Sequence, residues 1–424
     1  MNEIEQLIAQ LCPDGVAFKK LGEVGNFVRG SGIQKKDFVE SGVGCIHYGQ
    51  IYTYYKTAST KATKSFISET LARKCKKASP GDVVIATTSE NVEDVCKAVA
   101  WIGEGEIAVS GDAYIFKHSL NPKFVAYLFQ TERFLEHKRK YATGTKVIRV
   151  SGENIAKFEI PVPPLCIQER IVEILDKFTE LEAELEAELE ARRKQYEHYR
   201  NKLLTFTTPP NDENVRWCTL GEIGTFFGGL TGKSKADFTE GNAKYISYMN
   251  VFSNIAVNLD ALEKVKIGKE ERQNKVLFGD VLFTGSSETA EECGMSSVLT
   301  IEPAEDIYLN SFCFGFRLFE RDLFFPDFLK HLLRSKNVRN QIQKTASGVT
   351  RFNVSKKRML NVALPLPPLS EQRRIADILD KFEALTTSLQ DGLPAEIEAR
   401  RQQYRFYREK LLGFGRGRER LERD

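Results

Sequence analysis

The fold is decided by a segment that the chain carries twice, as IPVPPLCIQERIVEILDKF at residues 160–178 and as LPLPPLSEQRRIADILDKF at residues 364–382. A second matched pair follows, EARRKQYEHYRNKLLTF at residues 190–206 and EARRQQYRFYREKLLGF at residues 398–414. The first pair is offset by 204 residues and the second by 208. Two long matches in the same order exceed chance, so the chain contains an internal duplication.

Shorter matches extend the duplication into the parts that precede these blocks. Residues 21–25 read LGEVG and residues 220–224 read LGEIG, and Gly-Asp-Val recurs at residues 81–83 and 279–281. Gly-Asp-Val followed by apolar residues predicts a turn that leads into a buried strand. A repeat of about 200 residues is too long for a solenoid. The predicted order is therefore globular domain, helix, globular domain, helix.

The helical blocks have apolar residues at spacings of three, four and seven, which indicates a coiled-coil-like seam. About 38 residues at roughly 1.5 Å each give a rod of about 57 Å. In the first block, the repeat T-E-L-E-A-E-L-E-A-E-L-E at residues 179–190 strongly favours a continuous helix. In the second block, Gly392 and Pro394 predict a kink or break. The seam residues are Leu181, Leu185, Leu189, Tyr196, Tyr199, Leu385, Leu389, Tyr404 and Tyr407.

Apolar spacing also predicts one helix over residues 122–137 and one over residues 326–343. Because proline cannot continue a strand ladder, residues 161–164 and 365–368 are predicted to be rigid extended linkers. The sequence predicts an α+β protein in which two long antiparallel, coiled-coil-like helical regions separate two mixed α/β domains in a pseudo-twofold internal repeat.

This architecture implies five consecutive segments. They are a first globular domain at 1–160, a proline linker with the central helical spacer at 161–207, a second globular domain at 208–364, a proline linker with the C-terminal helical spacer at 365–414, and a charged tail at 415–424.

Composition excludes several classes of protein. The eight cysteines form no C-x-x-C pair, which argues against a zinc ribbon and a redox motif. Scattered single cysteines suit a reducing compartment. The N-terminus is acidic and amphipathic, and no run of 18 apolar residues exists. We therefore expect a cytoplasmic protein with no membrane span.

Catalytic signatures are missing from the sequence as well. It contains no G-x-x-x-x-G-K-[ST] phosphate loop and no Asn-Pro-Pro-Tyr or Asp-Pro-Pro-Tyr methyltransferase signature. Its five histidines lack metal-ligand spacing. We predict no catalytic residue, no metal site and no cofactor.

Local charge points to a nucleic acid, although the formal net charge is only +3. Residues 330–358 hold nine Lys or Arg and no acid, and residues 133–157 hold seven against two acids. Such patches neutralise phosphates, and glycine-rich loops and interleaved Gln, Asn and Tyr can contact backbone or bases. The candidate DNA-binding residues are Arg29, Lys35, Lys36, Tyr48, Gln50, Lys140, Thr143, Thr145, Lys146, Arg149, Lys233, Lys235, Tyr248, Asn250, Lys344, Ser347, Thr350, Arg351 and Asn353. A solvated basic face without a ligand is the alternative.

The duplicated P-x-P-P-L-x-x-Q-x-x-I block (residues 161–171 and 365–375) and the E-A-R-R-x-Q-Y-x-x-Y-R-x-K-L-L block (residues 190–204 and 398–412) resemble the specificity subunits of type I restriction–modification systems. The resemblance covers nearly the whole chain. It implies a non-catalytic subunit that reads a bipartite target in double-stranded DNA, one half-site per domain.

The same resemblance implies partner proteins. Two modification (methyltransferase) subunits would dock on the helices, and separate restriction (ATP-dependent endonuclease/translocase) subunits would cleave. Base-contacting residues vary within the family, so none carries over by motif. A structural or adaptor coiled-coil protein that binds no DNA is the alternative. Near-neutral net charge favours it, and the matched basic patches disfavour it.

Overall fold

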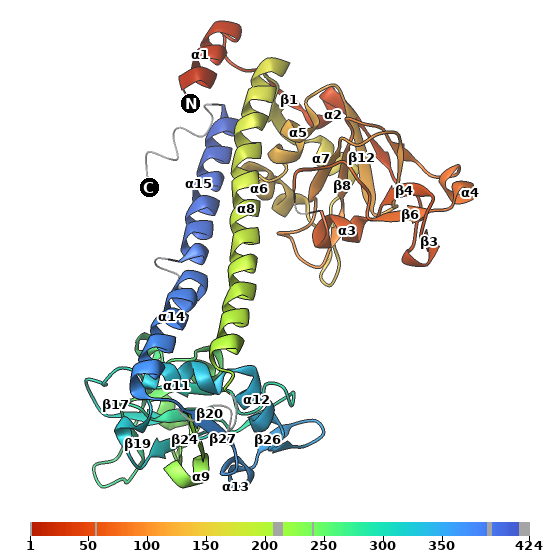
Figure 1. Cartoon of the computed structure of the whole chain (residues 1–424). Helices are drawn as coiled ribbons and strands as arrows, with labels where there is room; N and C mark the ends of the chain where they lie inside the picture. The colour runs from red at the N-terminus through yellow and green to blue at the C-terminus, as the bar shows by residue number, and fades with distance from the viewer. Residues whose placement is uncertain (1, 56, 207–214, 240, 388–391, 415–424) are drawn as a thin grey trace. The chain divides into compact units, whose positions relative to one another are not determined.

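The computed structural model describes residues 2–55, 57–206, 215–239, 241–387 and 392–414. The chain forms two compact units (Figure 1). Unit 1 is Met1–Glu186 with Glu396–Asp424, and unit 2 is Ala187–Ala395. Each unit therefore combines one globular domain with parts of two long helices, which chain order alone does not reveal.

Unit 1 is built from short strands and helices that are followed by one very long helix. Its elements are α1 (Asn2–Leu11), β1 (Phe18–Lys20), α2 (Leu21–Val24), β2 (Gly25–Arg29), η1 (Lys35–Asp37), β3 (Phe38–Val39), β4 (Val43–Ile46), α3 (Tyr48–Thr53), β5 (Ser59–Thr60), β6 (Ser65–Ile67), α4 (Glu69–Ala72), β7 (Lys77–Ala78), β8 (Val83–Ala86), β9 (Thr88–Ser89), β10 (Ala98–Trp101), β11 (Ile107–Val109), β12 (Ala113–His118), α5 (Pro122–Leu128), α6 (Glu132–Tyr141), β13 (Ile148–Arg149), α7 (Gly152–Ala156), β14 (Glu159–Pro161) and the first part of α8 (Leu165–Leu203).

Unit 2 repeats this plan. Its elements are the rest of α8, β15 (Arg216–Thr219), α9 (Leu220–Ile223), β16 (Gly224–Gly228), η2 (Lys235–Phe238), β17 (Ala243–Ile246), α10 (Tyr248–Ser253), η3 (Leu259–Ala261), β18 (Glu263–Val265), β19 (Lys275–Val276), β20 (Val281–Thr284), β21 (Ser286–Ser287), β22 (Ser296–Val298), β23 (Ile307–Leu309), β24 (Cys313–Leu318), η4 (Arg321–Leu323), α11 (Pro326–Leu333), α12 (Lys336–Gln343), β25 (Ala346–Ser347), β26 (Phe352–Val354), α13 (Lys356–Met359), β27 (Ala363–Leu366) and α14 (Leu369–Thr387). The last helix, α15 (Leu393–Gly413), lies almost wholly in unit 1.

The sheets confirm the internal repeat in three dimensions. One sheet of unit 1 has the order β2-β12-β8-β10-β5, and its counterpart in unit 2 has the order β16-β24-β20-β22. A second sheet of unit 1 has the order β3-β6-β4-β11-β7, and its counterpart in unit 2 has the order β18-β17-β23-β19; smaller sheets of two or three strands accompany them. Strands β8 and β20 follow the two Gly-Asp-Val turns and are buried along their whole length, as predicted. The predicted mixed α+β fold class is thus confirmed.

Two predicted helices are each broken in the middle. Residues 122–137 fall into α5 and α6, and residues 326–343 fall into α11 and α12. The break follows from a polar residue in the apolar pattern. Thr131 leaves helical geometry and its Oγ1 accepts the backbone N–H of Phe134, so it caps a new helix. Ser335 takes the matching place before α12.

The prediction that proline ends the strand ladder at these linkers is wrong for the first proline of each linker. Strand β14 includes Pro161, and strand β27 continues through Pro365 to Leu366. Each belongs to a two-stranded sheet, where a proline can leave its nitrogen on the open side. In the second helical region Gly392 forms a bend directly before α15, where the sequence predicts a kink or break, and residues 388–391 lie outside the described residues.

A buried glutamine joins each globular domain to its helix. The Oε1 of Gln168 accepts the N–H of Asn121 at 2.9 Å, and its Nε2 donates to the carbonyl of Pro163 at 2.8 Å. Gln372 does the same with Phe325 (2.8 Å) and Pro367 (2.9 Å). Both side chains are only 1% exposed. This explains the invariant spacing P-P-L-x-x-Q within the repeat.

An aspartate about two helical turns after each glutamine makes a second junction. Asp176 accepts hydrogen bonds from Tyr127 Oη (2.7 Å) and Lys123 Nζ (2.6 Å). In unit 2, Asp380 lies 2.6 Å from His331 Nε2 and 2.9 Å from Lys330 Nζ. The aspartate is repeated, and His331 stands at the position of Tyr127, whereas Lys123 and Lys330 come from different positions of the repeat.

Aromatic stacking holds the helices of each unit together. Phe178 of α8 stacks on Tyr407 of α15 at 5.3 Å and 25° in unit 1. Phe382 of α14 stacks on Tyr199 of α8 at 5.4 Å and 22° in unit 2. In unit 1, Arg401 also binds Glu182 and Glu186 of α8 at 2.6 Å each. The duplicated helical blocks therefore exchange partners, each packing on the other copy's counterpart.

The predicted seam residues divide into two groups. Tyr196, Tyr199, Tyr404 and Tyr407 are partly buried against the domains or the partner helix, and Leu185 and Leu189 are half-buried. Leu181 and Leu385, which match in the repeat, are 44% and 38% exposed. Leu389 lies outside the described residues. No described helix combines the length and apolarity needed to cross a membrane.

We predict that Gln372→Ala lowers the free energy of unfolding of unit 2 by about 2–4 kcal/mol, because the Phe325 N–H and the Pro367 carbonyl lose their buried partner. The expected fall in Tm is about 5–10 °C by calorimetry. Gln402→Ala on the exposed face of α15 is the control. A shift for Gln372→Ala no larger than that of the control would contradict the junction.

Candidate nucleic-acid interface

Each unit presents one hairpin at matching positions. Hairpin 1 is residues 143–149, closed by the bridge between Thr143 and Arg149 and paired with β9. Hairpin 2 is residues 347–353, carried by β25 and β26 and paired with β21. The sequences TGTKVIR and SGVTRFN share only their second residue, glycine. The frame is thus common, and the displayed side chains differ.

The shared glycine is required by the backbone of the hairpin. Gly144 has φ +106° and Gly348 has φ +149°, which are conformations that side chains disfavour. A Cβ at Gly144 would collide with the carbonyl of Val147, and one at Gly348 with the carbonyl of Arg351. These glycines therefore shape the hairpin.

Hairpin 2 holds an ordered guanidinium. Arg351 Nε and Nη2 donate to Ser286 Oγ at 3.1 and 2.9 Å. The carbonyl of Ser286 accepts the hydroxyl of Tyr248 at 2.8 Å, and burial raises the pKa of that phenol. Ser286 is buried while Arg351 is exposed, so the serine positions the arginine at the surface.

Unit 1 has a hollow of about 470 Å³ beside its entry loop, which we define as residues 29–36 and which corresponds to residues 228–235 of unit 2. It is lined by Arg29, Gly32, Ile33, Gln34, Lys35, His47, Tyr48, Ser110, Gly111 and Asp112. Arg29 Nε donates to the carbonyl of Gly111 at 2.9 Å. Burial, together with the charge of Lys35, lowers the pKa of His47, so its ring is neutral at neutral pH. The structure thus brings together three predicted residues, Arg29, Lys35 and Tyr48.

The hollow and hairpin 1 belong to one surface. Thr88 of β9 pairs with Arg149 of the hairpin, and its hydroxyl lies 3.4 Å from Asp112, which lines the hollow. Tyr52 Oη donates to the carbonyl of Thr88 at 2.9 Å. Strand β9 therefore connects the two predicted contact regions of unit 1.

The entry-loop lysines differ in their environment. Lys35, Lys36 and Lys235 are exposed. The side chain of Lys233 is only 7% exposed and binds Glu271 Oε2 at 2.5 Å and the carbonyl of Lys266 at 2.6 Å. Hydrogen bonds from the Gly268 N–H and from Lys233 lower the pKa of Glu271 to about 2. Lys233 is matched by an internal carboxylate, which removes it from the set of candidate phosphate contacts.

Glycine in the entry loop serves the domain interior. A Cβ at Gly30 would collide with the carbonyl of Ser110, and one at Gly229 with that of Asn310. We expected these glycines to let DNA approach the backbone closely, but the space beside them is filled by carbonyl groups of the same domain.

Two amides predicted to read bases are buried in the domains. Gln50 accepts the N–H of His47 at 3.1 Å and donates to Ser65 Oγ at 2.6 Å. Asn250 donates to the carbonyl of Asn258 at 2.8 Å and accepts its N–H at 3.0 Å. Their hydrogen-bonding groups are used, so they shape α3 and α10 instead of offering an edge to a base.

The remaining candidates are exposed. They are Lys140, Thr143, Thr145, Lys146 and Arg149 in unit 1, and Lys344, Ser347, Thr350 and Asn353 in unit 2. Thr143 Oγ1 bonds the carbonyl of Arg149 at 3.3 Å, and Lys140 lies 5.5 Å over the ring of Tyr141. Together, the lysines and the hairpin residues make the surface around each hairpin polar and basic.

Part of the acid-free basic stretch is structural. Arg334 and Arg339 donate to backbone carbonyls such as those of Ser296 (2.8 Å) and Gly294 (2.5 Å). Burial lowers the pKa of Arg334 to about 9 and that of Arg339 to about 10. These arginines tie loops to the helices, so the run of nine basic residues overstates the charge at the surface.

One cluster has the composition of a metal site. The ligand atoms of His331, Asp380 and Glu383 lie within 4.8 Å of one another. The ammonium of Lys330 stands 2.9 Å from Asp380 and 3.4 Å from Glu383, and Tyr196 Oη is 3.1 Å from His331 Nδ1. The ammonium of Lys330 therefore balances the charge of both acids. The cluster is part of the junction between the domain and the helix in unit 2.

Sequence reasoning missed Ser286 and Asp112, which place the surface groups. Nothing in the local sequence marks Asp112, and the role of Ser286 arises from strand pairing, so its local sequence carries only one signal. The recurrence of Ser-Ser-Glu at 286–288 against Thr-Ser-Glu at 88–90 was the available signal.

Comparison with known proteins places this surface in context. A family model described as "Type I restriction modification DNA specificity domain" matches residues 13–191 and again residues 213–399. The chain belongs to this family. The specificity subunit of the Escherichia coli type I restriction enzymes EcoR124I/EcoR124II is 31% identical over 305 residues, which cover 69% of this chain and 70% of that protein.

Solved structures agree on the fold of the specificity subunit. A chain from a study of complex assembly and conformational transition of the type I R-M system has a TM-score of 0.61 and 18% identity, covering 94% of this chain and 98% of that chain. The S subunit from M. genitalium has a TM-score of 0.51 and 13% identity, covering 93% and 96%. Two matched regions in one specificity subunit fit recognition of a bipartite DNA target, one half by each domain.

We predict that Lys233→Ala and Lys235→Ala of this specificity subunit have opposite signatures. Lys235→Ala should lower the salt slope of DNA binding by about one, because one phosphate contact is lost. Lys233→Ala should leave the slope unchanged and lower Tm by about 2–5 °C. Binding titrations at several salt concentrations and calorimetry measure both, and a lower slope for Lys233→Ala would restore it as a DNA contact.

Proposed function

We propose that this specificity subunit is itself non-catalytic and reads one half-site with each unit through hairpins 1 and 2 and the surfaces beside them. The observation that carries the proposal is a repeated frame with different displayed residues. Equivalent positions hold Lys146 and Thr350, Val147 and Arg351, and Arg149 and Asn353. Different side chains on one frame suit recognition of two different half-sites.

Base recognition in unit 2 centres on Arg351. Ser286 binds its Nε and Nη2 and thereby fixes the guanidinium while leaving Nη1 for a ligand. Fixing the side chain before binding lowers the entropy cost of a contact. A guanidinium end pairs with the O6 and N7 acceptors of guanine in the major groove. We therefore assign a guanine contact in the second half-site to Arg351.

The proposal extends to the partner subunits. Modification subunits, two per chain, would dock on the helical regions, and restriction subunits would supply cleavage. The matched leucines Leu181 and Leu385 support docking, because large apolar side chains stand exposed at equivalent places in the two units. The acids of α8 around Leu181 would repel DNA and favour a protein partner there.

Arg351→Ala should weaken DNA binding of the assembled complex and relax recognition at one base pair of the second half-site, at a cost of about 1–3 kcal/mol. Arg351→Lys keeps the positive charge but loses the paired N–H donors of the guanidinium. Its salt slope should therefore equal that of the wild type, while its base preference should be as relaxed as that of Arg351→Ala. Methylome sequencing with each variant reads the motif. Unchanged motifs in both variants would reject Arg351 as a base contact.

Leu181→Asn combined with Leu385→Asn should abolish assembly with modification subunits while shifting Tm by less than about 2 °C, since both residues are exposed. Ile301→Asn, also an exposed apolar residue but outside the helices, is the matched control. Light scattering gives the stoichiometry. Wild-type stoichiometry for the double variant would argue that other residues carry the docking.

A further inference from the structure

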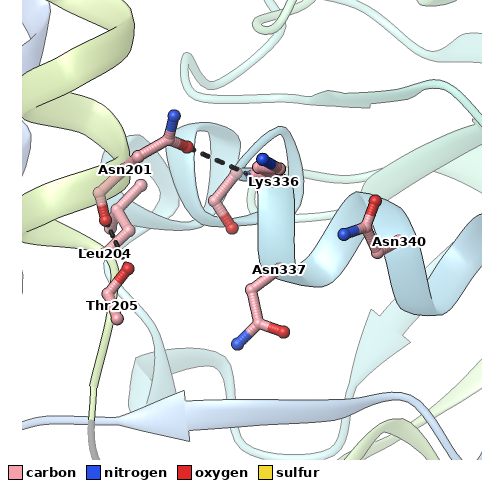
Figure 2. A pocket seen from close by; sticks show the side chains of 7 residues that line it. Asn201, Leu204, Thr205, Lys336, Asn337 and Asn340 are labelled. Carbon is pink, nitrogen blue, oxygen red and sulfur yellow. Dashed lines mark hydrogen bonds between the residues drawn. The ribbon is translucent and has the colours of Figure 1, made fainter.

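A hollow of about 400 Å³ lies between the end of α8 and the start of α12 in unit 2 (Figure 2). Its lining residues are Asn201, Leu204, Thr205, Ser335, Lys336, Asn337 and Asn340. Figure 2 shows Asn201 reaching across to the first residue of α12, with Asn337 and Asn340 on the helix beside the open space. The lining contains one lysine, several amides and hydroxyls, and no acid.

The start of α12 has backbone N–H groups and a hydroxyl that are weakly bonded or unbonded within the described residues. The N–H of Lys336 makes a long bond of 3.4 Å to Asn201 Oδ1, and no described group accepts the N–H of Asn337 or Val338. Ser335 precedes the helix and is only 2% exposed, yet its Oγ has no partner among the described residues. Unsatisfied N–H groups at a helix start carry partial positive charge and favour an anion.

The matching place in unit 1 shows which kind of group fits. There the N–H of Glu132, at the start of α6, donates to both carboxylate oxygens of Glu409 at 3.2 Å each. Thr131, the counterpart of Ser335, uses its hydroxyl to accept the N–H of Phe134. Unit 1 has therefore closed its helix start with its own carboxylate.

Three positions in the repeat lose an acid between unit 1 and unit 2. Glu409 corresponds to Asn201, Glu132 to Lys336, and Glu136 to Asn340. The backbone arrangement of the site persists, while the internal anion is replaced by a neutral amide and a lysine is added. An oxyanion from outside the chain would meet the same helix start, the Ser335 hydroxyl and the Lys336 ammonium.

The source of that oxyanion is indicated by the exposed face of α12. Lys336, Asn337 and Asn340 are exposed along this helix, and Lys344, the exposed residue that caps its C-terminal end, leads into hairpin 2. Eight residues span about 12 Å, which matches three to four nucleotides of one DNA strand along the helix axis. Helix starts are common phosphate-binding elements in protein–DNA complexes.

We propose that the start of α12 binds a backbone phosphate of DNA next to the half-site read by unit 2, a contact that unit 1 cannot make because Glu409 fills its counterpart. The inference rests on the proposed function, since it presumes that hairpin 2 lies on DNA. It adds an asymmetry, because the protein would contact a backbone phosphate outside the half-site of unit 2 and none at the matching place beside the half-site of unit 1.

The test transfers the carboxylate of unit 1 into unit 2. Asn201→Glu in the full chain, assembled with its modification subunits, should keep or raise Tm, because unit 1 shows that a glutamate fits there. Its Kd for target DNA should rise about three- to tenfold and its salt slope should fall by about one, with the methylated sequence unchanged. Ser335→Ala removes the hydroxyl without adding charge and should shift Kd in the same direction by a smaller factor.

Ala304→Glu, in an exposed acidic loop of unit 2, is the matched control for the added charge and should leave Kd within about twofold. Shortening the duplex beyond the second half-site should weaken the wild-type complex and leave Asn201→Glu unaffected. Wild-type affinity and salt slope in Asn201→Glu would overturn the proposal. So would a loss of subunit assembly with unchanged DNA affinity, which would identify a protein carboxylate as the occupant. Absence of sequence-selective binding by the wild-type complex would instead reject the proposed function.

Discussion

Gln168 and Gln372 each satisfy a backbone donor and a backbone acceptor with one buried side chain, and the placement of everything else depends on this junction. An amide is the side chain that can accept from the segment before α5 or α11 and donate to the proline segment at the same time. The junction sets where the long helix leaves the sheet. Asp176 and Asp380 then fix the helix against the domain.

Once the domain is fixed on its helix, the structure separates constant parts from variable parts. The helical blocks, the Gly-Asp-Val turns and the sheet order are repeated, and the hairpins, entry loops and helix starts differ. The variable parts carry the exposed basic and polar groups. Because they stand on a common frame, one fold displays two different sets of contacts, as a subunit that reads two half-sites requires.

Much of this architecture was predictable, because it follows from the periodic spacing of apolar residues and from the internal repeat. The duplicated blocks, the continuous α8 and the buried strands β8 and β20 followed from apolar spacing and from Gly-Asp-Val. The split of α5 from α6 was missed because a single threonine, Thr131, outweighs an otherwise helical pattern by capping a new helix.

The candidate site was harder to predict than the fold. Lys233, Gln50 and Asn250 have the residue types of DNA contacts, but each is paired inside its domain, and sequence alone does not reveal a partner distant in the chain. Arg351 was identified by its charge, whereas its positioning by Ser286 required the pairing of β21 with β26. Charge counting identifies a region, and hydrogen bonding decides which members face a ligand.

The central claim is that the two domains read their half-sites independently. The most direct test replaces residues 1–150 with the corresponding domain of another specificity subunit and determines the methylome of a host that also expresses the modification subunits. The account predicts a motif with one half changed and the other half identical to that of the parent chain. A motif changed in both halves, or in neither, would contradict it.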